Sequence, residues 1–84
     1  MFKWLETFKV VYETKNFSKA SEILFISQPT VSAQIKQLEN EFGTQLFIRS
    51  GRKEVLVTPQ ADILYERAVD LMNDWENLYQ AVQT

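Results

Sequence analysis

The sequence predicts a mainly α-helical fold with three short helices, a two-stranded hairpin and one long final helix. Apolar residues recur at helical spacing in four segments. Two β-prone segments flank a turn that contains Gly51, and Thr58-Pro59 gives a start signal for the last helix. The chain has 84 residues, of which 45% are hydrophobic. This length allows one small core, so we expect one compact unit without a separate second domain.

Residues 2–14 are predicted to form the first helix. Leu5, Phe8 and Tyr12 fall on one helical face, and Val11 lies beside them. We therefore expect this helix to present one apolar face to the core.

A second, short helix is predicted from Ser18 to about Phe25. The hydroxyl of Ser18 can accept a hydrogen bond from a free backbone N–H of the first turn, so we expect this residue to be the N-cap. Ala20, Ile23 and Leu24 give the helix an inward face.

The third helix is predicted to begin at Ser27, a further N-cap, with Pro29 in the first turn, where a missing N–H is harmless. Gly43 is a natural residue to end it. One apolar stripe runs along this helix and consists of Val31, Ile35, Leu38 and Phe42. Because only Ile26 and Ser27 separate the second and third helices, we expect the steep crossing of a helix-turn-helix.

Two short strands are predicted next, at residues 46–49 and 54–57. The turn 50–53 joins them, and Gly51 supplies the backbone freedom that a tight turn needs. Three helices followed by a two-stranded wing make a winged helix-turn-helix domain over residues 1–58.

Residues 59–84 are predicted to form one long helix, with Thr58 as N-cap and Pro59 at its first position. At about 1.5 Å per residue, this helix spans roughly 38 Å. An unbroken heptad seam runs along it and consists of Ala61, Leu64, Ala68, Leu71, Trp75, Leu78 and Val82. Tyr65, Met72 and Tyr79 widen the seam along one edge.

This apolar stripe is too broad for a small winged helix to cover alone. The alternative is packing within the same chain, which we expect for the first turns, at Ile63 and Leu64. For the remainder we predict that two long helices pair and that the chain is a homodimer. The predicted interface residues are Leu64, Ala68, Leu71, Met72, Trp75, Leu78, Tyr79 and Val82.

The outer face of the third helix is small and polar. Opposite the apolar stripe lie Pro29, Thr30, Ala33, Lys36, Gln37 and Asn40, with Gln28 and Gln34 at the edges. Slim residues, amides and hydroxyls near a helix N-terminus suit entry into the major groove of DNA. The alternative is an ordinary solvated face, because polar outer faces are the rule for surface helices.

The hairpin turn is basic. Arg49, Arg52 and Lys53 precede the first carboxylate, Glu54. A guanidinium group at a hairpin tip can reach phosphates or enter the minor groove. The alternative is a charged turn that only maintains solubility, because exposed charged turns are common.

The net charge of −2 is unevenly distributed. Residues 1–58 carry eight cationic and six anionic side chains, hence +2, whereas residues 59–84 carry one and five, hence −4. The acidity therefore belongs to the long helix. The local charge of a surface, rather than the total, decides whether that surface meets phosphate.

The composition excludes several classes of function. Without Cys or His, the chain lacks disulfides, thiolate metal ligands and imidazole bases. No apolar run approaches the roughly 20 residues of a membrane span, and the first residues do not resemble a signal peptide. We expect a cytoplasmic, non-enzymatic module without a cofactor or a membrane partner.

An ordered set of motifs covers about two thirds of the chain. These are Phe17-Ser18-Lys19-Ala20, Leu24, Ser27-Gln28-Pro29-Thr30-Val31-Ser32, Ile35, Leu38-Glu39, Gly43, Leu46-Phe47, Arg49 and Thr58-Pro59. In this order and spacing they resemble the LysR-type transcriptional regulators of bacteria. The resemblance implies a winged helix-turn-helix whose long linker helix pairs with a second subunit. It also implies full-length proteins, usually tetrameric, with a small-molecule effector domain that these residues do not include.

The resemblance also assigns roles to residues. The groove-reading residues would be Ser27, Gln28, Pro29, Thr30, Ser32 and Ala33. Lys36, Arg49 and Arg52 would serve phosphates or the minor groove, and Ser18 would cap the second helix near the DNA backbone. Many members have Arg where this chain has Ala33, so specificity is expected to depend more on Gln28, Thr30 and Gln37.

Two hypotheses follow. The first is sequence-specific binding of double-stranded DNA at a palindromic operator by a dimer that regulates transcription. The second is a winged helix used only for protein interaction or dimerisation. The cations of the wing and Lys36 argue against the second hypothesis, because such modules usually lose them.

Overall fold

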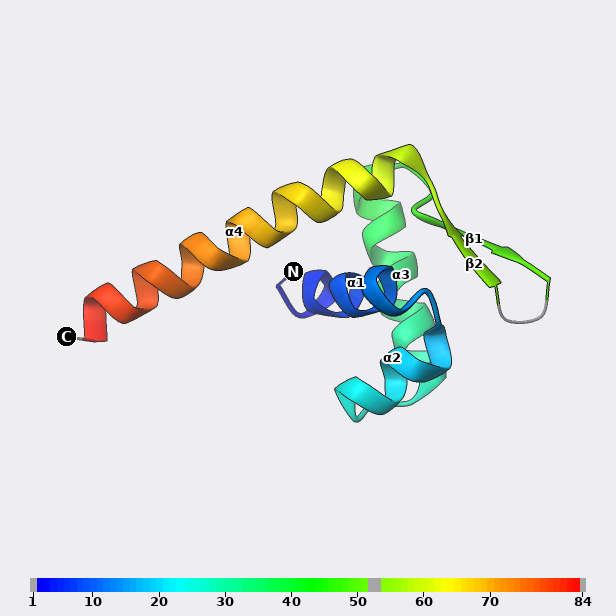
Figure 1. The fold of residues 1–84 in the computed structure, drawn as a ribbon, viewed down its shortest axis with the longest axis horizontal. Coiled ribbons are helices and arrows are strands. Elements are labelled where there is room, and N and C mark those ends of the chain that lie inside the picture. The colour runs from blue at the N-terminus through cyan, green and yellow to red at the C-terminus, as the bar shows by residue number, and fades with distance from the viewer. Residues whose placement is uncertain (1, 52–53, 84) are drawn as a thin grey trace.

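The computed structural model describes residues 2–51 and 54–83. The elements are α1 (Phe2–Thr14), α2 (Phe17–Leu24), α3 (Gln28–Phe42), β1 (Phe47–Ser50), β2 (Glu54–Val57) and α4 (Pro59–Gln83). Figure 1 shows α1, α2 and α3 gathered beside the β1–β2 hairpin, while α4 projects away from them. The molecule measures 48 × 27 × 19 Å. The predicted mainly α fold, a winged helix-turn-helix followed by a long helix, is confirmed.

The start of α2 differs from the prediction. The N-cap is Asn16 rather than Ser18, and the Asn16 side chain accepts a hydrogen bond from the backbone N–H of Lys19 at 2.9 Å. The helix begins at Phe17 because that ring belongs to the core, where it is 7% exposed. The preceding residue is then the cap, and Asn is as effective there as Ser.

The limits of α3 agree with the prediction. Ser27 is the N-cap, and its Oγ accepts a hydrogen bond from the backbone N–H of Thr30 at 3.2 Å. Gly43 ends the helix with a φ of +62°, in the left-handed region that glycine adopts without strain. Phe25, at the end of α2, is also left-handed, with a φ of +57°.

The core lies where α1 meets α2, α3, the hairpin base and the first half of α4. Its largest fully buried side chains are Phe8, Leu38, Leu46, Val11 and Val31. The ring centroid of Phe47 lies 5.4 Å from that of Phe8 and 6.0 Å from that of Phe17. The hairpin base and the helices therefore share one core.

Three residues predicted to face inward lie on the surface. Ile23 and Phe42 are each 50% exposed, and Ile63 is 62% exposed. Ile23 and Phe42 occupy the last turns of α2 and α3, beyond the edge of the core. Ile63 lies on the side of α4 opposite the buried Ala61.

The hairpin is antiparallel and pairs Phe47 with Val57 and Arg49 with Val55. Its first strand begins at Phe47, one residue later than predicted. Thr58 is buried at the hairpin base, where its Oγ1 donates to the carbonyl of Gln45 at 2.8 Å.

The same base is fixed to both neighbouring helices. The Oγ1 of Thr58 accepts a hydrogen bond from the N–H of Ala61 at 3.2 Å, which confirms Thr58 as the N-cap of α4. On the other side, Oε2 of Glu39 in α3 accepts from the N–H groups of Leu46 at 2.8 Å and Phe47 at 3.3 Å. The wing is thus held against α3 and α4 at its base.

Candidate nucleic-acid interface

The N-terminal part of α3 presents polar side chains to solvent. We call this surface the α3 edge, defined by Ser27, Gln28, Pro29, Thr30, Ser32, Ala33, Lys36 and Gln37. All of them are exposed except Ser32, which is half-buried. The buried Val31, Ile35 and Leu38 hold the opposite side of α3 in the core. The structure therefore brings the predicted recognition residues together on one accessible surface.

Hydrogen bonds order the N-terminal end of this edge. The hydroxyl groups of Ser27 and Thr30 lie 2.7 Å apart. The Oγ of Ser18, on α2, donates to Oε1 of Gln28 at 3.0 Å. Ser18 was expected to contribute through the helix cap, and in the structure it instead contacts a predicted recognition residue.

Arg49 connects the wing to the α3 edge. Its Nη2 donates to the Oγ of Ser32 at 3.0 Å, and its guanidinium carbon lies 4.0 Å from the centroid of the Phe17 ring. Arg49, Ser32, Lys36 and Glu39 line one hollow between wing and helix. Because Glu39 accepts hydrogen bonds from the backbone of the hairpin base, the two cations and the hydroxyl remain the groups suited to phosphate. Arg52 and Lys53 lie outside the described residues.

A pair of tyrosines joins α1 to α4. The rings of Tyr12 and Tyr65 stack with centroids 4.1 Å apart. The hydroxyl of Tyr12 donates to Oδ1 of Asp62, and that of Tyr65 donates to Oε2 of Glu13. The hydrogen bond to Asp62, followed by desolvation, raises the pKa of Tyr12 to about 12. The hydrogen bond to Glu13 likewise raises the pKa of Tyr65.

This junction was not predicted from the sequence. Tyr12 was expected on the core face of the first helix and Tyr65 at the margin of the heptad seam. Each bond joins a hydroxyl and a carboxylate that are 50 or more positions apart in the chain. Apolar spacing in a single helix carries no signal for such a pair.

The second half of α4 carries an apolar surface that its own chain leaves largely open. We call it the α4 strip: Leu71, Trp75, Leu78, Tyr79 and Val82. Their exposed fractions range from 48% at Leu71 to 74% at Val82. The Trp75 ring still contacts Phe2 of α1, with ring centroids 5.6 Å apart.

The other predicted interface residues lie closer to the core. Ala68 is 2% exposed, so it packs inside its own chain and offers no surface to a partner. Leu64 and Met72 are partly buried against the core. The seam therefore divides into a first half that faces α1 and a second half that forms the α4 strip.

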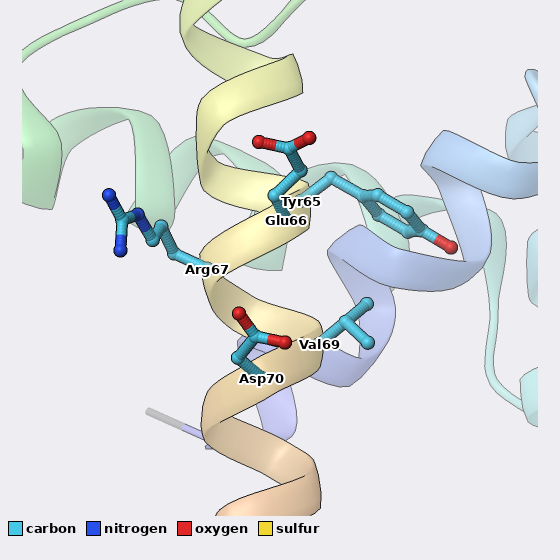
Figure 2. A pocket seen from close by; sticks show the side chains of 5 residues that line it. All are labelled: Tyr65, Glu66, Arg67, Val69 and Asp70. Carbon is cyan, nitrogen blue, oxygen red and sulfur yellow. The ribbon is translucent and has the colours of Figure 1, made fainter.

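A surface cavity along α4 is lined by Tyr65, Glu66, Arg67, Val69 and Asp70. Figure 2 shows Arg67 and Tyr65 pointing to opposite sides of the helix, so these side chains do not converge on one ligand. Among the described residues, no group of three or more His, Cys, Asp or Glu side chains is placed to hold a metal ion. No helix in residues 2–51 or 54–83 is long and apolar enough to cross a membrane.

Comparison with known proteins gives one consistent family. Residues 2–62 match the family of bacterial regulatory helix-turn-helix proteins, lysR family. The transcriptional regulator CitR of Bacillus subtilis is 45% identical over 76 residues, which cover 90% of this chain and 26% of CitR. The regulator CysL of the same organism is 54% identical over 68 residues, which cover 81% of this chain and 22% of CysL. The chain thus spans about a quarter of the length of these relatives.

Solved structures agree with this result. The BenM DBD in complex with catB site 1 DNA has a TM-score of 0.91 and 34% identity, covering 99% of this chain and 92% of that chain. Vibrio fischeri DarR in complex with DNA has a TM-score of 0.92 and 34% identity, covering 99% of this chain and 28% of that chain. Because the family match covers most of the sequence and the fold agrees along its whole length, the chain belongs to the LysR family of bacterial regulatory helix-turn-helix proteins.

Proposed function

We propose that this chain binds double-stranded DNA sequence-specifically as a dimer and so regulates transcription. The observation that carries the proposal is the α3 edge, an exposed surface of hydroxyl, amide and small side chains whose one charged member is Lys36. Relatives with the same fold support it, since the BenM DBD and DarR are described in complexes with DNA.

In this proposal α3 enters the major groove and the wing lies along the DNA backbone. Gln28, Thr30 and Gln37 read base edges, and each good contact contributes roughly 1–3 kcal/mol of discrimination. Lys36 and Arg49 neutralise phosphates, which fixes the register of the protein on the duplex. Arg52 and Lys53, which the sequence places at the wing, add to this electrostatic attraction.

The dimer forms through the α4 strip. Five apolar side chains along one helix, each 48% to 74% exposed, are costly to leave in water. Two copies of the strip bury each other about a two-fold axis. Such a pair presents two α3 edges to a palindromic operator.

The proposal extends to the full-length protein. The resemblance to LysR-type regulators implies that it is tetrameric and binds a small-molecule effector outside residues 1–84. The relatives are about four times as long as this chain, which leaves room for such a domain. It acts in the bacterial cytoplasm as a regulator rather than as an enzyme, since its relatives are transcriptional regulators. Residues 1–84 function without a cofactor, because they contain neither His nor Cys.

A salt titration of DNA binding tests the core of this proposal. Affinity should fall as salt rises, because phosphate contacts release counterions. Lys36→Gln should weaken binding to all duplexes about three- to tenfold and lower the salt slope by about one unit per chain. Lys9→Gln removes one charge from α1, where Lys9 pairs with Glu13 at 3.5 Å, and serves as the matched control. Binding that is insensitive to salt, or equal for all three proteins, favours the protein-interaction alternative.

A further inference from the structure

A hydrogen bond joins α2 to the first residue of α3. The Oγ of Ser18 donates to Oε1 of Gln28 at 3.0 Å, and both side chains are exposed. Ser18 is not needed to start α2, because Asn16 is the N-cap. Its side chain is therefore available to act on the α3 edge.

This bond biases the orientation of the Gln28 amide. The hydroxyl of Ser18 has a single proton, and it is donated to Oε1. Since the amide is planar, its amino group Nε2 lies on the branch turned away from Ser18. The two N–H groups of Nε2 have no hydrogen-bond partner within residues 2–51 and 54–83, so the α3 edge presents them as donors.

We propose that Ser18 is a positioning residue that makes Gln28 a reader of hydrogen-bond acceptors. This inference rests on the proposed function, because it concerns how the α3 edge distinguishes bases. Glutamine reads adenine by accepting from N6 with Oε1 while donating to N7. With one lone pair of Oε1 engaged by Ser18, Gln28 turns the two N–H donors of Nε2 towards the DNA. The major-groove acceptors are O6 and N7 of guanine, N7 of adenine and O4 of thymine. Outward donors therefore favour guanine and thymine over adenine, because the adenine acceptor lies beside the N6 donor, and over cytosine, which presents only a donor.

The size of the effect follows from the exposure of the pair. A neutral hydrogen bond in contact with water biases an orientation but does not lock it. Loss of the Ser18 hydroxyl should therefore lower the preference at the base that Gln28 reads by about three- to tenfold. It should leave the other base positions unchanged.

The experiment uses the whole 84-residue chain and duplexes selected from a random library. Fluorescence anisotropy with single-base variants of the selected duplex first locates the position at which Gln28→Ala loses discrimination. Ser18→Ala is then measured on the same variants. Ser21→Ala is the matched control, because the Ser21 hydroxyl donates to the carbonyl of Ser18 at 2.7 Å, within α2. Ser18→Thr keeps a hydroxyl and should restore the wild-type preference.

The expected result is a preference for guanine or thymine at the Gln28-dependent position, reduced in Ser18→Ala and retained in Ser21→Ala. In the Gln28→Ala background, Ser18→Ala should have no further effect. The inference is overturned if that position prefers adenine or cytosine, if Ser18→Ala changes nothing, or if it weakens all duplexes equally. If wild type itself binds every duplex alike, the failure lies in the proposed function.

Discussion

Phe25 combines two unfavourable features. Its backbone is left-handed, with a φ of +57°, and its side chain is 93% exposed. A left-handed conformation costs a residue with a Cβ roughly 1–2 kcal/mol. Because the ring is exposed, it contributes little hydrophobic stabilisation that could offset this cost. The fold needs the conformation because the backbone turns here from α2 towards α3.

Replacing Phe25 with glycine should therefore stabilise the protein. Phe25→Gly is expected to raise the free energy of unfolding by about 1 kcal/mol, because glycine adopts a positive φ without steric cost. Urea denaturation followed by circular dichroism measures this change. Phe25→Ala removes the ring but keeps the Cβ and should be close to wild type. Equal stability of the two variants would show that the backbone conformation is not the cause.

At the scale of elements, the sequence predicts correctly those features that depend on residues adjacent in the chain. The caps at Ser27, Gly43 and Thr58 were found because the capping residue and the helix that it ends are adjacent in the chain. The cap of α2 was missed because burial of Phe17 selects Asn16, and that burial depends on contacts with the hairpin.

The same distinction applies to the candidate site. Helical periodicity identified most of the α3 edge, since one helix defines it. It did not indicate that Arg49 contacts Ser32 or that Ser18 contacts Gln28, because these bonds join separate elements. Nor did it separate Ala68 from the exposed part of the heptad seam, since only the position of α1 decides which turns of α4 are covered.

The junction between α1 and α4 should respond to alkaline pH. Tyr12 ionises near pH 10 in the unfolded chain, but its folded pKa is about 12. The neutral phenol is thus favoured by folding, and its contribution to stability is complete below pH 10 and is lost as pH rises towards 12.

Tyr12→Phe removes the titrating group from this junction. The variant should show a smaller late phenolate absorbance than wild type, because Tyr65 alone then titrates late, and it should lose less stability between pH 10 and 12. Spectrophotometric titration combined with denaturation at each pH tests both points. Tyr79→Phe is the control, because the Tyr79 hydroxyl has no carboxylate partner in the described part of the chain. A late transition of undiminished amplitude in Tyr12→Phe would contradict the assignment, because only the part that belongs to Tyr65 should remain.

At the scale of the whole molecule, the α4 strip determines the proposed assembly. Trp75→Glu places a charge in the middle of the strip, where Trp75 is 51% exposed. We expect wild type to sediment as a dimer and the variant as a monomer, because burying an unpaired carboxylate in an apolar interface is unfavourable. Asn77→Glu adds the same charge on the opposite side of α4 and should remain dimeric. Wild type that is already monomeric at high micromolar concentration would exclude pairing through α4.

The stacked tyrosines lie close to the start of α4, and Figure 1 shows the remainder of that helix extending away from the body. Beyond Trp75, whose ring contacts Phe2 of α1, the remaining arm to Gln83 is about 12 Å long. By simple trigonometry, a tilt of about 5° at Trp75 moves the far end by about 1 Å at that length. In a dimer joined through α4, a small change in the angle of either α4 would therefore change the distance between the two α3 edges. In the proposed dimer, the contacts that hold α4 against α1, among them the stacked Tyr12 and Tyr65, would therefore limit the variation in the distance between the two α3 edges.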